Sequence, residues 1–184
     1  RLGGYSEISK QLIMQSSIDV ENFVRNDLMM AISLAIDSAA INGSGSSNQP
    51  TGILNTTGIG SVAGGTNGAA PTYSDIINLE REVAVDNADL GNLAFLTNPK
   101  VRAKLKGTAL DSGSGLFVMQ SNNELMGYKA GVSTQVPSDL TKGSGTALSA
   151  IIFGNWNDLM IGQWGGLDIV VDPYTLATTN MLRV

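Results

Sequence analysis

Three aspartates near the C-terminal end of the sequence, Asp158, Asp168 and Asp172, are the residues whose types and spacing could best support chemistry. Two carboxylates, one protonated and one ionised, can hydrolyse a glycosidic bond, and a DxDxDG run of them can bind calcium. The sequence contains no such run. We therefore interpret these aspartates as residues that cap turns and keep a β region soluble, and a carboxylate hydrolase remains a distant alternative.

Other catalytic groups are missing from the sequence. It has no His and no Cys, which excludes Ser-His-Asp catalysis, HExxH zinc sites and thiolate chemistry. A serine–lysine pair occurs only as the adjacent Ser9 and Lys10, and no SxxK or GxSxG pattern is present. The sequence predicts no enzyme, no catalytic residue, no cofactor and no metal site.

Charge and hydropathy exclude two further classes of partner. The net charge of −5 argues against a nucleic-acid-binding face, which needs clustered Lys and Arg. The densest basic group belongs to a short predicted helix and is interpreted as a solvated face: Lys100, Arg102, Lys104 and Lys106. No apolar run approaches the roughly 20 residues that span a membrane. Only 15% of the residues are charged, which indicates either an unusually compact monomer or a surface that partners partly cover.

The element best defined by the sequence is a long helix over residues 18–41. Ser16 and Ser17 offer an N-cap, Asp19 and Glu21 are expected in the first turn, and Asn42-Gly43 offers a left-handed stop. The second half is apolar almost all round, which is typical of a helix covered on more than one side. We expect a central rod that packs under a sheet or is shared with a neighbour.

The other predicted elements follow a Gly/Ser/Thr/Asn-rich linker at residues 43–72. Two helices are predicted, one over 73–86 with a capping box from Thr72 to Asp75 and one that Asn98-Pro99 begins and Gly107 ends. Short strands are predicted over 93–96, 116–119, 125–137 and 151–153, with a turn at Gly154-Asn155 and a loop at 141–147.

The two ends of the chain complete the predicted α+β order. Residues 1–15 read as a short strand and a turn of helix capped by Ser9, and 180–184 as one further strand. Near the C-terminal end we expect a hairpin of strands 159–164 and 167–171 that turns at Gly165-Gly166. Trp156 and Trp164 flank it and are interpreted as core or interface anchors.

Four stretches together resemble the major capsid family of tailed phages and prophages. They follow one another in the family's order and at suitable spacing: AIDSAAINGSGSSNQPTGIL at 35–54, LAFLTNPKVRAKLKG at 93–107, LMGYKAGVSTQVP at 125–137 and IIFGNWNDLMIGQWGGLDIVVDPYT at 151–175. The family similarly has a long helix that runs into an NGxG turn and a P-x-GIL step, an Asn-Pro helix cap, and an IGxRGGL…DP segment.

The resemblance implies the phage capsid shell fold, with a long backbone helix, a partial peripheral-domain sheet and a mixed α/β axial domain. Residues 1–47 would belong to the peripheral domain, 48–174 would form the axial domain, and 175–184 would return to the peripheral sheet. The chain would be a fragment of a subunit that assembles with its own copies into pentamers and hexamers and encloses the genome. Possible further partners are scaffold and portal proteins, and the location would be the virion capsid, assembled in the bacterial cytoplasm.

One residue carries a sharper implication of the resemblance. Cross-linking members of the family join an Asn in this return strand to a Lys of the extended loop, and Asn180-Met181-Leu182 is similar to that neighbourhood. The Lys and its assisting Glu would lie outside this sequence. Asn180 is therefore the candidate isopeptide acceptor, and an ordinary strand residue is the simpler interpretation.

Two other functions stay open at this point. An encapsulin-like bacterial compartment shell would share the fold, and the sequence does not separate it from a phage shell. A secreted β-rich adhesion module would also be acidic and rich in Gly, Ser, Thr and Asn. The long apolar helix favours the shell fold over the adhesion module. We expect the isolated chain to be monomeric or loosely associated.

Overall fold

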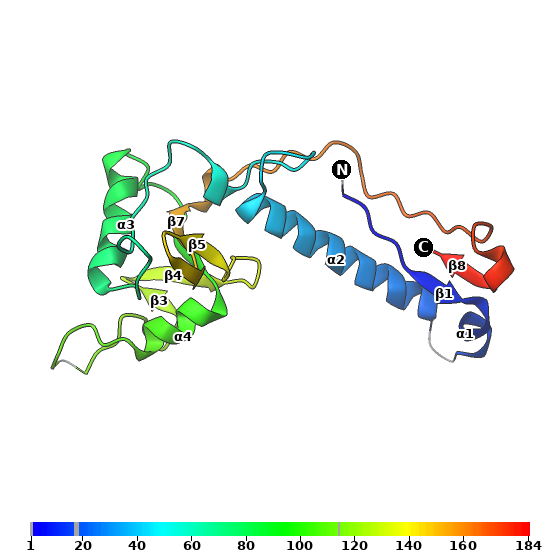
Figure 1. Cartoon of the computed structure of the whole chain (residues 1–184), viewed down its shortest axis with the longest axis horizontal. Helices are drawn as coiled ribbons and strands as arrows, with labels where there is room; N and C mark the ends of the chain where they lie inside the picture. Colours follow the sequence, from blue (N-terminus) through cyan, green and yellow to red (C-terminus); the bar gives the residue numbers. More distant parts are fainter. Residues whose placement is uncertain (1, 17–18, 114) are drawn as a thin grey trace. The chain divides into compact units, whose positions relative to one another are not determined.

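A computed structural model describes residues 2–16, 19–113 and 115–184 (Figure 1). Helices and strands are mixed along the chain, which confirms the predicted α+β class. The contacts divide it into two compact units: unit 1 is Arg1–Gly52 with Gly162–Val184, and unit 2 is Ile53–Ile161. The predicted boundaries fall at 47/48 and 174/175, whereas the compact units meet at 52/53 and 161/162.

Unit 1 combines both ends of the chain. It contains β1 (Glu7–Ser9), α1 (Lys10–Gln15), α2 (Val20–Asn42), the 3-10 helix η3 (Ala177–Thr179) and β8 (Met181–Arg183). Strands β1 and β8 pair antiparallel, with Ile8 opposite Leu182. The structure therefore confirms the strand and helical turn that were predicted within residues 1–15. It also confirms the predicted C-terminal strand. Ser9 occupies the N-cap position of α1 but makes no capping hydrogen bond through its side chain.

The long helix α2 begins two residues later than predicted. Asp19 is its N-cap, and the carboxylate accepts a hydrogen bond from the backbone N–H of Asn22 at 3.1 Å. Ser16 instead ends α1, and Ser17 lies outside the described residues. An aspartate is the stronger N-cap here because its charge also interacts favourably with the positive end of the helix dipole.

The helix stop differs from the prediction in its backbone conformation. Gly43 has φ −58°, so the chain leaves α2 without a left-handed residue. Its carbonyl accepts a hydrogen bond from Gly52 N at 2.8 Å, and Ser44 forms an antiparallel bridge with Thr51. A Cβ on Gly52 would lie 2.7 Å from Asn42 N. Glycine is needed at this helix end because two backbone segments approach closely, not because the turn is left-handed.

Unit 2 contains a four-stranded sheet and two helices. The elements in chain order are η1 (Ile53–Asn55), α3 (Tyr73–Val85), β2 (Leu93–Thr97), α4 (Pro99–Gly107), β3 (Glu124–Leu125), β4 (Tyr128–Val132), β5 (Leu140–Lys142), β6 (Gly145–Leu148), β7 (Ile151–Asn155) and η2 (Trp156–Asp158). The strand order is β3-β4-β2-β7, and β2 is parallel to β4 and antiparallel to β7. Strands β5 and β6 form a separate antiparallel pair.

Both predicted helix starts in unit 2 are confirmed. Thr72 and Asp75 form a reciprocal capping box at α3. Asn98 caps α4 by accepting a hydrogen bond from Val101 N at 2.9 Å, and Pro99 occupies the first helical turn. Both helix starts could be predicted from the sequence because the hydrogen-bonded groups in each lie only three residues apart.

The core of the described chain lies in unit 2. Its buried side chains come from both helices, the sheet and the segment before β3: Ile76, Phe95, Val101, Leu105, Val118, Met119 and Leu125. Phe95 stacks on Phe153 with ring centroids 4.3 Å apart, and Tyr128 meets both rings edge-on. The aromatic cluster binds β2, β4 and β7 into one packed layer.

Three predictions for the middle of the chain were wrong in detail. Residues 116–119 form no strand but a single bridge between Ala109 and Phe117, and Val118 and Met119 enter the core. The predicted strand 125–137 is split by a turn at Met126-Gly127 into β3 and β4. The predicted loop 141–147 is the β5–β6 hairpin, in which Asn67 Oδ1 accepts a hydrogen bond from Ser144 N at 3.1 Å.

The predicted C-terminal hairpin does not form. Gly154 and Asn155 continue β7, which therefore extends beyond the predicted 151–153, and residues 159–171 run as one unpaired segment. The boundary between the two compact units, at Ile161 and Gly162, falls inside the first expected arm. Ile169 and Val171 become half-buried in unit 1, so contacts with other elements replace the pairing that local sequence favours.

Candidate functional site

Asp172, one of the three aspartates considered from the sequence, has a structural role. Asp172 accepts hydrogen bonds from the backbone N–H groups of Tyr174 at 2.8 Å and Thr175 at 3.1 Å, and from the Thr175 hydroxyl. These bonds, with the hydroxyl contributing most, lower the pKa of Asp172. An ionised carboxylate held in this way caps a turn, as predicted.

The remaining carboxylates and the indoles also support structure. Asp158 accepts a hydrogen bond from Asn155 Nδ2 at 2.7 Å, and Asp168 lines a cleft in unit 1. Trp156 donates its indole N–H to Ala94 O at 2.9 Å and so anchors the sheet, whereas Trp164 is 95% exposed. Among the residues described, no three His, Cys, Asp or Glu side chains are grouped to hold a metal ion.

The basic group on α4 is only partly a solvated face. Lys104 and Lys106 are exposed, whereas Lys100 donates from Nζ to Ala147 O at 2.6 Å. That bond ties α4 to the β5–β6 hairpin. Over the described ranges, no helix is both long enough and apolar enough to cross a membrane.

Asn180 lies where η3 gives way to β8. It adopts the left-handed conformation, with φ 55° and ψ 36°, and its carbonyl accepts a hydrogen bond from Lys10 N at 3.1 Å. The residue is exposed, so its side chain is accessible from outside the chain. Its role as an isopeptide acceptor stays a prediction.

A polar network that sequence reasoning missed fixes the return of the chain into unit 1. Arg183 on β8 forms an ion pair with Glu7 on β1 at 2.7 Å, and its guanidinium lies 4.8 Å from the ring centre of Tyr5. The hydrogen bond from Glu7 raises the pKa of Arg183. Because Glu7 and Arg183 lie at opposite ends of the chain, no local pattern could have indicated the pair.

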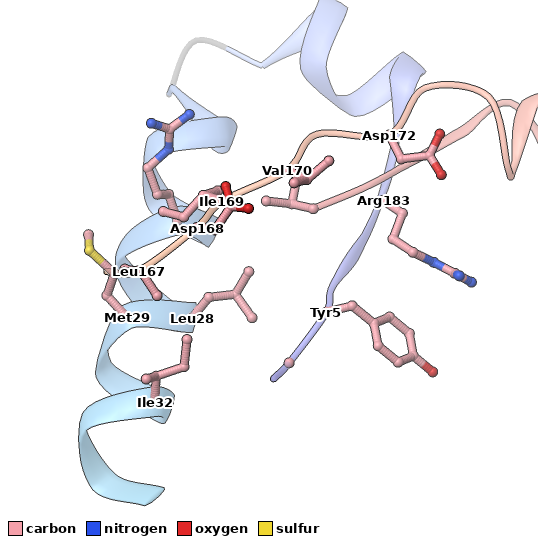
Figure 2. Close-up of a pocket in the computed structure, with 13 residues that line it drawn as sticks. Tyr5, Leu28, Met29, Ile32, Leu167, Asp168, Ile169, Val170, Asp172 and Arg183 are labelled. Atoms are coloured by element: carbon pink, nitrogen blue, oxygen red, sulfur yellow. The ribbon is translucent and has the colours of Figure 1, made fainter. Parts of the chain in front are cut away.

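Unit 1 also contains a small, mainly apolar cleft of about 320 Å³. Leu28, Met29 and Ile32 of α2 line it together with residues 167–170. Figure 2 shows these side chains beside one another, with Arg183 and Tyr5 at the far end. Asp168 and Asp172 line it as well. Because Asp172 accepts the turn hydrogen bonds of Tyr174 and Thr175, we interpret the cleft as packing surface.

Unit 2 contains a wider cleft of about 1430 Å³. Its walls are α3, the glycine-rich segment 56–71, the β5–β6 hairpin and part of β7. Charges of both signs lie along it, among them Glu82, Asp86 and Lys104. This mixture matches no single class of small ligand.

The most distinctive feature of unit 1 is exposed apolar surface. One buried residue, Ile41, lies on α2. Phe23, Met30 and Leu34, which we call the α2 stripe, are 67%, 60% and 51% exposed. Their spacing of seven and four residues places them on one face of the helix. The expected covering of α2 is thus incomplete within this chain, and an apolar stripe on a helix is typical of a surface that meets other protein.

A second exposed apolar stretch is the unpaired segment 159–171, which we call the open segment. Met160 is 91% exposed, Trp164 95% and Val170 65%. The α2 stripe and the open segment are the candidate functional surfaces, because the clefts and the polar residues offer no chemistry. Sequence patterns predicted that α2 is apolar, but not which of its residues stay uncovered.

Comparison with known proteins identifies the family of this chain. The model of the phage capsid family matches residues 1–184. The chain is 31% identical over 185 residues to the major capsid protein of Halomonas phage phiHAP-1, a match that covers 100% of this chain and 28% of that protein. The chain therefore spans less than a third of the length of this curated relative.

Solved structures show the same fold at low sequence identity. A chain of Microbacterium phage Oxtober96 superposes with a TM-score of 0.71 at 16% identity, over 98% of this chain and 61% of that one. The capsid of a native GTA particle gives a TM-score of 0.67 at 18% identity, over 98% and 63%. The predicted capsid shell fold is confirmed. The match of the family model along the whole sequence establishes that this chain belongs to the phage capsid family.

Proposed function

We propose that this chain forms part of a structural subunit of a bacteriophage or prophage icosahedral capsid, and that it is not an enzyme. The observation that carries the proposal is the family match over all 184 residues. The structure supports it through the exposed apolar side chains of unit 1.

In this proposal unit 1 is the peripheral domain and unit 2 the axial domain. The axial domain would meet its copies around five-fold and six-fold axes, and α2 would be the rod of the peripheral domain. Contacts of this kind are heterologous, because different patches of two copies meet and the rotation closes a ring. A ring of identical contacts is stable even when each pair binds weakly.

The α2 stripe is the first surface that such assembly would bury. Burial of apolar surface contributes about 25 cal/mol for each Å² removed from water, and Phe23, Met30 and Leu34 are all more than half exposed. Covering them with another part of the shell would favour assembly. The low charged fraction of 15% is consistent with surface that solvent does not reach in the assembled state.

Several finer roles belong to the same proposal. The full-length subunit would contact scaffold and portal proteins, assemble in the bacterial cytoplasm, and remain in the virion capsid. Asn180 would accept an isopeptide bond from a lysine of another segment if the full-length protein cross-links. Its exposure in the described structure supports that access.

Electron microscopy of the full-length protein tests the proposal. We expect closed shells from the wild type, and loss of shells when Met30 and Leu34 are both replaced by Gln. Asn26→Gln is the matched control because Asn26 is an exposed polar residue of α2, and it should assemble normally. A full-length wild type that stays as free subunits under assembly conditions would contradict the proposal.

A further inference from the structure

Two Asn-Gly pairs occur in the sequence, Asn42-Gly43 and Asn67-Gly68. In such a pair the backbone nitrogen of the glycine can attack the side-chain carbonyl of the asparagine, because both groups belong to one chain and the glycine has no side chain to hinder the approach. The attack begins deamidation, in which the side-chain amide becomes a carboxylate without the help of an enzyme. The structure gives the two pairs very different surroundings.

Asn42-Gly43 lies at the end of α2, where the attacking nitrogen is held. The N–H of Gly43 donates a hydrogen bond to Ala39 O at 2.9 Å. Gly43 is also buried, and a Cβ added to it would collide with the backbone carbonyls of Ala39 and Pro50. Because the nitrogen cannot turn toward the Asn42 side chain without breaking this helix end, we expect Asn42 to be protected.

Asn67-Gly68 lies in the glycine-rich segment 56–71, outside every helix and strand of the described chain. Asn67 is exposed, and the N–H of Gly68 donates no hydrogen bond to any described residue. Water can therefore reach the side-chain amide of Asn67, and no acceptor in the described chain competes for the proton of the attacking nitrogen.

A backbone donor from the turn of the β5–β6 hairpin lies at the carbonyl that would react. Ser144 N donates to Asn67 Oδ1 at 3.1 Å. Added Cβ atoms on Gly143 and Gly145 would collide with Asn67 Oδ1 and Asn67 O, so two glycines allow this close approach. Negative charge develops on Oδ1 when a nitrogen attacks the carbonyl carbon, and an N–H group already placed there stabilises that charge.

We propose that Asn67 is a site of spontaneous deamidation and that the fold promotes the reaction through the Ser144 N–H. Solvent base takes the proton of Gly68 N, and this nitrogen forms a bond to Asn67 Cγ while Oδ1 becomes an oxyanion held by Ser144. The Cγ–Nδ2 bond then breaks, and the side-chain nitrogen leaves as ammonia with a proton from water. The cyclic imide that remains takes up water and opens to aspartate or isoaspartate.

The two products change the contact between the glycine-rich segment and the hairpin in opposite ways. Aspartate keeps an oxygen for the Ser144 N–H, and a hydrogen bond to a charged acceptor is the stronger one. Isoaspartate carries the main chain through the former side chain, which displaces the Asn67 carbonyl that lies against Gly145. Either product adds a negative charge beside the wide cleft of unit 2, which Gly68 and Lys142 line.

Peptide mapping by mass spectrometry after incubation of the chain measures the reaction. Each deamidation adds about 1 Da, because OH replaces NH2. We expect the modified fraction at Asn67 to grow roughly tenfold faster in the folded chain than in the chain unfolded in urea, which has no donor at Oδ1. At Asn42 the folded chain should react more slowly than the unfolded one. A folded chain in which Asn67 reacts no faster than in urea, or no faster than Asn42, would overturn the proposal.

Two substitutions at residue 144 test the donor. Ser144→Pro removes the backbone N–H, whereas Ser144→Ala keeps it and is the matched control. We expect deamidation of Asn67 to slow roughly tenfold in Ser144→Pro, because a donor at an exposed site contributes less than the about 100-fold of one in a water-excluded site. Ser144→Ala should keep the wild-type rate. Equal rates in the two variants would overturn the role of the Ser144 N–H.

A glycine variant covers the case in which the proline unfolds the hairpin. Gly145→Ala brings a Cβ against Asn67 O, so it should push the turn away from Asn67 and slow the deamidation. Gly113→Ala is its control and should keep the wild-type rate, since nothing lies within 4 Å of its added Cβ. Circular dichroism verifies that both variants are folded. An unchanged rate at Asn67 in folded Gly145→Ala would contradict promotion by the fold.

Discussion

The two compact units bury very different amounts of apolar side chain. Unit 2 contains the Phe95–Phe153–Tyr128 stack and the helix residues Ile76 and Leu105, both 0% exposed. In unit 1 the buried apolar residues among those described are Ile8, Ile41 and Val184. Unit 1 is held by the β1–β8 strand pair, by the ion pairs Glu7–Arg183 and Glu21–Arg25, and by the close approach of Gly43 and Gly52.

Under the proposed function, this contrast would give the two units different parts in assembly. A unit with its own core is defined before assembly, while a unit with exposed apolar surface gains its full packing from neighbours. An exposed helix stripe adds little to the stability of one chain, but its burial can favour association.

Replacing a phenylalanine by alanine should lower the free energy of unfolding strongly in unit 2 and hardly at all in unit 1. Phe95→Ala removes a fully buried ring from unit 2 and should lower the free energy of unfolding by about 3–5 kcal/mol. Phe23→Ala removes a ring that is 67% exposed on α2 and should change it by less than about 0.5 kcal/mol. Urea unfolding followed by circular dichroism measures both. Equal losses would show that unit 1 has a core of its own.

Backbone packing at the end of α2 should matter more than side-chain burial in unit 1. Gly52→Ala would bring a Cβ to 2.7 Å from Asn42 N, and overpacking of this kind costs about 1–3 kcal/mol. Gly3→Ala is the control, since nothing lies within 4 Å of its added Cβ. Thermal unfolding of the two variants should separate them clearly, and a stable Gly52→Ala protein would refute the close approach.

Removal of the Asn98 cap of α4 should lower the stability of unit 2 by a moderate amount. Asn98 is 2% exposed, accepts from Val101 N and donates to Pro137 O at 3.0 Å. Asn98→Ala loses the cap and should cost about 0.5–2 kcal/mol, with a further penalty for the unpaired Pro137 carbonyl. Asn98→Asp retains the acceptor and should recover the cap contribution. Chemical unfolding of both variants gives the comparison, and no difference between them would contradict the capping role.

The smallest expected effect is a pH dependence in unit 1. Hydrogen bonds to Asp172 lower its pKa in the folded chain, so its stabilising contribution is complete above the unfolded value of about 3.9. The contribution is lost as the pH falls through the lower folded value. Amide NMR signals of Tyr174 and Thr175 should shift in that acidic range, and the shift should disappear in Asp172→Asn. An unchanged shift in the variant would assign it to another group.

Local elements could be predicted because their determinants are close in sequence. The capping box at Thr72 and Asp75 and the Asn98-Pro99 start each involve groups three residues apart, and the period of α2 repeats within a few turns. The exclusion of chemistry that needs His or Cys likewise follows from composition alone, because the sequence contains neither residue. The resemblance to the capsid family indicated the fold that the comparisons confirm.

Pairing between distant segments could not be predicted in the same way. Residues 141–147 form a hairpin tied to Asn67, Arg183 meets Glu7 across the length of the chain, and 159–171 stays open although its sequence favours a hairpin. Each outcome depends on which other surface competes for the same side chains. Local propensity carries no information about that competition.

The sequence alone determined that α2 is long and apolar almost all round, since helical spacing and residue type are local properties. Only the tertiary structure decided that Ile41 is buried while Phe23, Met30 and Leu34 remain uncovered. The physical reason is that burial depends on the neighbours that the fold brings to each face of the helix. In this chain the neighbours of α2 are few, and its exposed face therefore becomes the candidate surface for assembly.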